Sequence, residues 1–387
     1  MPDRPDEPKT AATIAAEVPV ESALGQLTLR VLPPARPPSA EPPAVRPPVS
    51  ARTRNKILRF ADALEARRDE KQQLAFSPED FIRFGLPYKR FAGTEYERRN
   101  GGMRYRITSV PEHGVPFGQD RLLPIWLATA YSVCGQPESG VIQFRSVRDI
   151  LLAFGLPTGG SKHLALKESL LRLTHATLFV YDERQRDGKA SGERYIVRRY
   201  NLIDAVDLWF DKHGKQPNQY SLWQNFITLS RSFSASLRQK VMPLDLGTVR
   251  ALKNNPMALD LYIWQAHRSW ELHQKGLSSV GVPVFGAEGL LAQLGSQVVA
   301  EKKARQLIRA SQELVEGVWR SCPNHLTRDG NRLVLRPAED LKDARLSLPG
   351  VTSRPPVTRL LDAVGAPSPG VSEDKRLLVR RPPVDES

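Results

Sequence analysis

The sequence is poor in the residues that mark secreted and membrane-spanning proteins. It has two cysteines, Cys134 and Cys322, in 387 residues, which excludes a disulfide framework and fits a reducing compartment. No apolar run approaches the roughly 18 to 20 residues of a membrane span, and the amino-terminal residues have no apolar signal core. We therefore expect a soluble, cytoplasmic protein that does not enter a membrane.

The residue clusters that support catalysis or metal binding are also missing. The seven histidines are scattered, and none lies with cysteine or another histidine at metal-ligand spacing. Residues 155–162 resemble a phosphate loop, but Ser161 precedes Lys162, the reverse of the order that the nucleotide motif needs. We therefore expect no enzyme, no cofactor and no metal, and interpret this segment as a turn followed by a helix capped by Ser161.

Positive charge is what the chain has in excess. Its formal net charge is +14 and its pI is near 9.9, so its surface attracts polyanions. Nucleic acid, an anionic membrane and simple solubility are all compatible with this charge. A hydrophobic content of 40% is enough for two domains with real cores. Many of the 32 prolines lie in the two tails, which we expect to be extended and disordered because they contain few large apolar residues.

The most informative stretch runs from Gly286 to Arg336. Its pattern predicts a short helix, a tight turn at Gly295, a longer basic helix and a hairpin turned at Asp329-Gly330. Helix, turn, basic helix and β-wing is the order of a winged helix-turn-helix, which places its second helix in a DNA groove.

The long helix of this stretch has two different faces. One is apolar at helical spacing and predicts a core stripe: Ala304, Leu307, Ile308, Leu314, Val315 and Val318. The other carries candidate groove contacts, with Lys303 at its edge and further candidates on the hairpin. These candidate DNA-binding residues are Lys302, Lys303, Arg305, Gln306, Arg309, Arg328, Asn331 and Arg332.

The same order of elements is predicted in the first half of the chain. A buried helix over residues 120–133 precedes a strand, a helix with a capping box at Ser146 and Asp149, a second helix over residues 162–174, and a hairpin. Leu166, Leu170 and Leu173 should face inward. The matching candidate DNA contacts are Lys162, Arg172, Arg184, Arg186 and Lys189.

The predicted fold class is α+β, with two tandem winged-helix domains and disordered Pro-rich tails. A leader with a linking helix covers residues 1–74, and the first winged helix covers residues 75–240. The second winged helix, which we expect to carry more of the sequence reading, covers residues 241–345, and a basic tail covers residues 346–387.

Three segments resemble the RepA-type plasmid replication initiators. They are Gly85-Leu-Pro-Tyr88, Pro116-Phe-Gly-Gln-Asp-Arg-Leu-Leu-Pro-Ile-Trp-Leu127 and Ile142-Gln-Phe-Arg-Ser-Val-Arg-Asp-Ile-Leu-Leu-Ala-Phe-Gly-Leu156. The resemblance implies a bacterial, plasmid-associated protein that binds directly repeated origin sites (iterons) in double-stranded DNA. It also implies opening of an adjacent A·T-rich segment, recruitment of the host initiator and replicative helicase, and a homodimer that limits copy number.

Two other classes of protein stay open on this sequence. A winged-helix transcriptional repressor would need the same contacts but would bind a palindromic operator as a dimer. A protein-interaction module would use the basic helices as solvated surface only.

Overall fold

The elements expected in the first half of the chain form in the computed structural model, in the expected order. A 3-10 turn, η1 (Gly118–Arg121), leads into α3 (Leu122–Val133), and the following elements are β6 (Val141–Phe144), α4 (Val147–Ala153), α5 (Gly160–Thr174), β7 (Thr177–Asp182) and β8 (Ile196–Asn201). Helix α3 is buried along nearly its whole length, because its side chains are apolar on most faces. The Ser146 side chain caps α4 by accepting from the Asp149 amide, as predicted.

The structure describes residues 73–100, 102–182, 196–208, 225–296, 298, 300–319, 322–338 and 344–351, with residues 17–20, 27–30 and 55 in the leader. All of these residues belong to one compact unit that ends at Ser353. Most of both predicted disordered tails lies outside the described residues.

The second half of the chain also follows the predicted order. The elements are β11 (Val241–Asp245), α7 (Leu246–Leu252), α8 (Pro256–Gln274), β12 (Val280–Pro283), α9 (Leu290–Gln293), α10 (Glu301–Val318), β13 (His325–Leu326) and β14 (Arg332–Leu335). Gly295, after α9, and Gly330, between the strands, have φ of +68° and +72°. Because a side chain is strained in this left-handed region, both turns favour glycine.

Helix α10 packs its predicted apolar stripe against the core. Ala304, Ile308, Leu314, Val315 and Val318 are buried, and Leu307 is partly buried against them. Buried amides also join α10 to α8: Gln265 Nε2 donates to Gln312 Oε1 at 2.7 Å. This packing fixes which side of α10 stays in contact with water.

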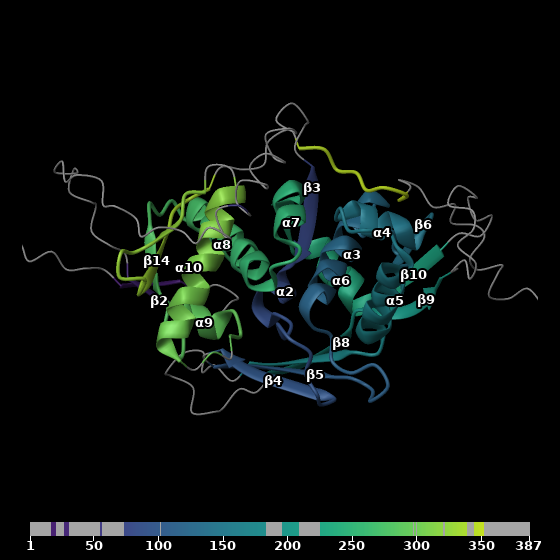
Figure 1. Ribbon diagram of the computed structural model, residues 1–387, viewed down its shortest axis with the longest axis horizontal. Helices are drawn as coiled ribbons and strands as arrows, with labels where there is room; N and C mark the ends of the chain where they lie inside the picture. Colours follow the sequence, from purple (N-terminus) through teal and green to yellow (C-terminus); the bar gives the residue numbers. More distant parts are fainter. Residues whose placement is uncertain are drawn as a thin grey trace, which may run out of the picture. The chain divides into compact units, whose positions relative to one another are not determined.

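Apart from a two-stranded pair in the leader, the described residues form four antiparallel sheets (Figure 1). The sheets that join distant segments have the strand orders β11-β3, β6-β10-β9 and β4-β5-β7-β8, and the fourth has the order β12-β14-β13. The further strands are β3 (Leu74–Pro78), β4 (Glu95–Asn100), β5 (Met103–Thr108), β9 (Ile203–Asp207) and β10 (Asn225–Leu229), and the further helices are α2 (Glu79–Phe84) and α6 (Arg231–Gln239).

Hydrogen bonds connect the two predicted domains within this unit. Strand β3, before the predicted boundary at residue 240, pairs with β11 after it. The Arg121 guanidinium bonds Asp260 of α8, and the Tyr88 hydroxyl donates to the Leu294 carbonyl oxygen at 2.6 Å. The two predicted domains therefore share a polar interface.

Three local predictions need correction. Helix α5 begins at Gly160 with Gly159 as its N-cap, so Ser161 lies in the first turn and does not cap the helix. Residues 17–20 and 27–30 of the leader form two paired strands, β1 (Glu17–Val20) and β2 (Leu27–Arg30), in which alternating apolar residues suit strand pairing. Residues 346–351, expected in the disordered tail, are placed by buried Leu348 and by a bond from the Arg145 amide to the Gly350 carbonyl oxygen.

Candidate nucleic-acid interface

The water-facing side of α10 forms one wall of an open groove, and the tip of the β13–β14 hairpin lies at its edge. The residues that line this groove, called the α10 groove below, are Glu301, Lys302, Arg305, Gln306, Arg309 and Asp329. Four of them are predicted DNA contacts. Lys303 is exposed on the same helix but is not part of the lining.

The hairpin is tied to the helix by a side chain of the groove. Arg309 Nη2 donates to the Arg328 carbonyl oxygen at 2.9 Å, and a Cβ added at Gly330 would lie 3.0 Å from Arg309 Nε. Arg328 itself is exposed at the tip. The helix and hairpin therefore present their polar groups as one surface.

The hairpin tip is ordered by its own acidic residue. Asp329 accepts from the Thr327 hydroxyl at 2.6 Å and from the Asn331 side-chain amide at 2.7 Å. The bond from Thr327, followed by that from the Asn331 amide, lowers the pKa of Asp329. Asn331, a predicted DNA contact, thus uses its amide group within the turn.

Two of the predicted arginines have partners within the protein. Arg305 Nη2 lies 2.6 Å from Glu301 Oε1, and its guanidinium lies 5.2 Å from the centre of the Phe285 ring. Arg332 Nη2 donates to the Gly281 carbonyl oxygen of β12 at 3.2 Å. Arg332 is thus directed across the sheet, whereas Arg305 stays partly exposed at the groove.

The charge of the groove is mixed. Lys302, Arg305 and Arg309 face two carboxylates, Glu301 and Asp329. The three cations exceed the two carboxylates by one charge, and the Gln306 amide adds an uncharged hydrogen-bonding group to the lining. A surface of this kind can meet phosphates with its cations and base edges with its amide.

The corresponding residues of the first half lie in different surroundings. Lys162 is half-buried at the start of α5. Arg172, expected on the outer face of α5, instead points inward: its Nε and Nη2 lie 2.7 and 2.9 Å from the two carboxylate oxygens of Asp120. The predictions for Arg184, Arg186 and Lys189 lie outside the described residues.

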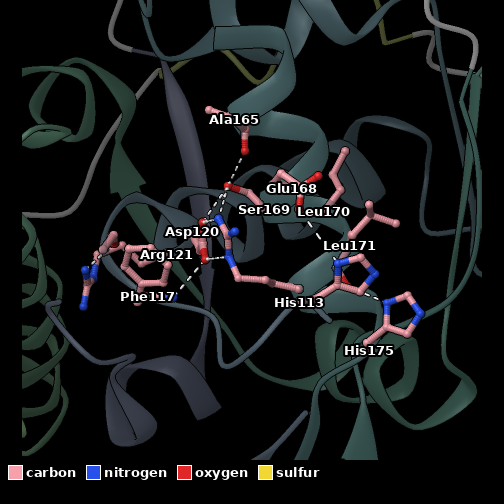
Figure 2. Close-up of polar contacts among 12 residues, drawn as sticks. His113, Phe117, Asp120, Arg121, Ala165, Glu168, Ser169, Leu170, Leu171 and His175 are labelled. Atoms are coloured by element: carbon pink, nitrogen blue, oxygen red, sulfur yellow. Dashed lines mark hydrogen bonds and ion pairs between the residues drawn. The ribbon is translucent and has the colours of Figure 1, made fainter. Parts of the chain in front are cut away.

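Figure 2 shows the surroundings of Asp120, the partner of Arg172. Ser169, one turn earlier on α5, donates to Asp120 Oδ1 at 2.6 Å, and the Phe117 amide donates to Asp120 Oδ2 at 2.8 Å. Asp120 is only 2% exposed, so its charge needs these donors. The Arg172 side chain therefore faces inward, contrary to the outward position expected of a DNA contact, because the buried Asp120 carboxylate of η1 takes up its charge.

Some members of the α10 groove were not selected from the sequence. Glu301 lies four residues before Arg305, the spacing of a helical ion pair, and this spacing could have revealed it. The sequence marks Asp329 only as a turn residue, and its place in the groove follows from the packing of the hairpin.

Two other kinds of site are absent from the residues that the structure describes. Within them, no three His, Cys, Asp or Glu side chains come together in a way that could hold a metal ion. Of the helices in this part of the chain, none is both long and apolar enough to cross a membrane.

The comparisons with known proteins concern the middle of the chain most directly. Residues 141–280, from β6 to the first residue of β12, match the family model described as plasmid encoded RepA protein. None of the curated proteins compared with the chain matches it.

Two solved structures of RctB show a distant likeness. The crystal structure of selenomethionine derivatives of RctB domains 2 and 3 has a TM-score of 0.43 and 12% identity, covering 60% of this chain and 84% of that one. A second crystal structure of RctB domains 2–3 has a TM-score of 0.42 and 11% identity, covering 67% of this chain and 96% of that one. The family match confirms the resemblance drawn from the sequence: over residues 141–280, the chain is similar to the RepA-type plasmid replication proteins.

Proposed function

We propose that this protein initiates plasmid replication by binding duplex DNA at directly repeated origin sites, with the α10 groove as its main sequence-reading contact. The family match supports a role in plasmid replication, but it ends at residue 280, before α10. The DNA-binding part of the proposal therefore depends on the geometry of the groove.

The observation that carries the proposal is the joint presentation of α10 and the hairpin. Lys302, Gln306 and Arg309 line one groove, and Arg309 is bonded to the backbone of the hairpin at Arg328. A helix in the major groove beside a hairpin on the adjacent backbone is the docking mode of a winged helix. In this mode Gln306 would read a base edge, and Lys302 and Arg328 would meet phosphates.

A second contact by the first half of the chain completes the proposed arrangement. Helices α4 and α5 repeat the order of α9 and α10. Of the two predicted DNA contacts on α5, Arg172 is bonded to Asp120, so Lys162 at the start of the helix remains the candidate. Two winged helices in one chain would bind successive stretches of a repeated site, and their linkage would raise the effective concentration of the second contact. Opening of an A·T-rich segment, recruitment of the host initiator and helicase, and a copy-limiting homodimer belong to the same proposal, which involves binding without a catalytic step.

The test is footprinting on plasmid DNA next to the gene, with matched variants of α10. Lys302→Ala removes a cation that lines the groove, and Lys303→Ala removes the same charge from a residue beside it. Gln306→Ala changes no charge and should cost about 1 to 3 kcal/mol of discrimination at one base pair. We expect protection of direct repeats, weakened by Lys302→Ala and Gln306→Ala and much less by Lys303→Ala.

Other outcomes would point elsewhere. A single palindromic footprint over a promoter would favour a transcriptional repressor. Equal losses for Lys302→Ala and Lys303→Ala would mean that only net charge matters. Absence of selective protection at moderate salt would show that α10 is solvated surface. At moderate salt, nonspecific electrostatic binding is weakened most, so sequence-specific binding should still be visible there.

A further inference from the structure

The sheet of β4, β5, β7 and β8 has one face packed on the core and one face in contact with water. Along β5, Met103, Tyr105 and Ile107 are buried, and the alternate residues Arg104, Arg106 and Thr108 are half-buried. In the view of Figure 1, the labelled helices lie on one side of β4 and β5. The side chains that project from the other side, called the outer sheet face below, are Glu95, Glu97, Arg99, Arg104, Arg106, Thr108, Thr177, Phe179, Tyr181, Val197, Arg199 and Asn201.

Two aromatic rings stand next to each other on this face. Phe179 and Tyr181 are alternate residues of β7, and their rings lie 6.4 Å apart between centres with an angle of 18°. Neither is fully buried, and Val197, opposite Tyr181 on β8, is 46% exposed. The core packs against the other face of the sheet, so these exposed apolar side chains are not needed to form it.

Arginines surround the two rings. The Arg104 guanidinium lies 3.9 Å from the centre of the Tyr181 ring, and that of Arg199 lies 6.0 Å from the centre of the Phe179 ring. The Arg104 guanidinium covers one face of Tyr181, so a base would stack on ring surface that it leaves free, with positive charge beside it. Aromatic platforms between arginines are the usual means of holding single strands, because every base offers a π-face.

The charge of the outer sheet face favours an anionic partner. Four arginines lie on it with two carboxylates, Glu95 and Glu97. Arg106 is engaged by both carboxylates, and its hydrogen bond lowers the pKa of Glu97. Arg99 and Arg199 are exposed toward opposite edges of the sheet, on β4 and β8, so a chain of phosphates could run from one to the other across the rings.

We propose that the outer sheet face binds single-stranded DNA, with bases stacked on Phe179 and Tyr181 and phosphates paired with Arg99 and Arg199. A duplex does not fit this chemistry, because its bases are already stacked and paired inside the helix. The site would be separate from the α10 groove, and it would hold a strand only after that strand has been exposed.

The test compares binding of labelled oligo(dT) to the full chain and its variants by fluorescence anisotropy. Phe179→Ala with Tyr181→Ala should weaken binding by tenfold or more, since each base–aromatic stack contributes about 1 to 3 kcal/mol. Arg199→Ala should also weaken it, whereas Arg198→Ala, an exposed arginine one residue earlier on the opposite side of β8, should not. Circular dichroism and binding of duplex origin DNA serve as controls for folding, and both should stay unchanged.

Several results would overturn the proposal. Equal losses for Arg198→Ala and Arg199→Ala would show a response to net charge alone. Tighter binding to oligo(rU) than to oligo(dT) would assign the face to RNA. If the double aromatic variant leaves oligo(dT) binding intact and instead shifts sedimentation from dimer to monomer, the face is an interface between two copies of this chain. Loss of duplex binding by α10 variants would leave this test unaffected, so the two proposals fail separately.

Discussion

The Arg121 guanidinium lies 2.8 Å from a carboxylate oxygen of Asp260, joining the start of the buried helix α3 to helix α8 in the second half of the chain. Both side chains are largely shielded from water, with exposed fractions of 4% and 14%. Burial raises the pKa of Asp260, and the charge and hydrogen bond of Arg121 act in the opposite direction. The pair therefore links the two predicted domains through a polar contact. Removal of either side chain would leave the other one, largely shielded from water, without its partner.

Asp260→Asn should lower the free energy of unfolding by on the order of 3 kcal/mol, because it leaves the buried Arg121 guanidinium without its counter-charge. Urea denaturation followed by tryptophan fluorescence measures the loss. Asp204→Asn, at an exposed position of β9, is the matched control and should change stability little. A loss for Asp260→Asn as small as that of the control would mean that the pair does not stabilise the interface.

Arg172→Gln should act on stability and leave DNA binding unchanged. It removes the cation from buried Asp120, which is 2% exposed, and should cost about 3 kcal/mol of unfolding free energy. Lys167→Gln removes the same charge from an exposed position of α5 and should be nearly neutral. If Arg172→Gln instead weakened DNA binding with full stability, the original expectation of a DNA contact would be restored.

Gly330→Ala should disturb the groove as well as the turn. Its φ of +72° alone should cost about 1 to 2 kcal/mol for an alanine, and the new Cβ would press on Arg309 at 3.0 Å. Gly114→Ala isolates the first effect, since Gly114 has a φ of +70° with open space around it. We expect similar losses of stability, measured by thermal unfolding, but a loss of DNA affinity for Gly330→Ala alone. Equal DNA affinities would show that the position of Arg309 is unimportant for binding.

Stability should fall as the pH falls from about 6.5 to 4, and buried His267 should be one cause. Burial lowers its pKa to about 4 from 6.5, so the unfolded chain binds a proton in this window that the folded chain does not. Each unit of pKa difference is worth about 1.4 kcal/mol, so the contribution is on the order of 3 kcal/mol, complete above pH 6.5 and lost toward pH 4.

Urea denaturation at pH 7 and pH 5 checks this expectation. His267→Gln should reduce the difference between the two pH values, whereas His273→Gln, at an exposed position of the same helix, should preserve it. The groups that act on His267 are Glu271, Arg268, Glu79 and Arg83, so these side chains stay unchanged in both variants. An unaltered pH dependence in His267→Gln would assign the effect to other groups.

Much of the local structure followed from sequence patterns alone. The apolar spacing of residues 304–318 predicted the buried side of α10, and Gly295 and Gly330 marked turns whose positive φ favours glycine. The family resemblance was also visible in short packing segments of the first half, and the match over residues 141–280 confirms it. These features depend on residues close together in the chain, where periodicity and backbone sterics decide the outcome.

The partners of charged side chains were decided only by the tertiary structure. Arg172 fits an outward helical position equally well, and it turns inward because Asp120, 52 residues earlier, is buried beside it. Arg98 likewise donates to the carbonyl oxygen of Gln293, 195 residues later. The next residue, Arg99, points to the other side of β4 and lies on the outer sheet face. The sequence by itself determined the elements and their apolar faces; the long-range packing decided which arginines stay in water, because a buried carboxylate or carbonyl attracts whichever cation the fold brings near it.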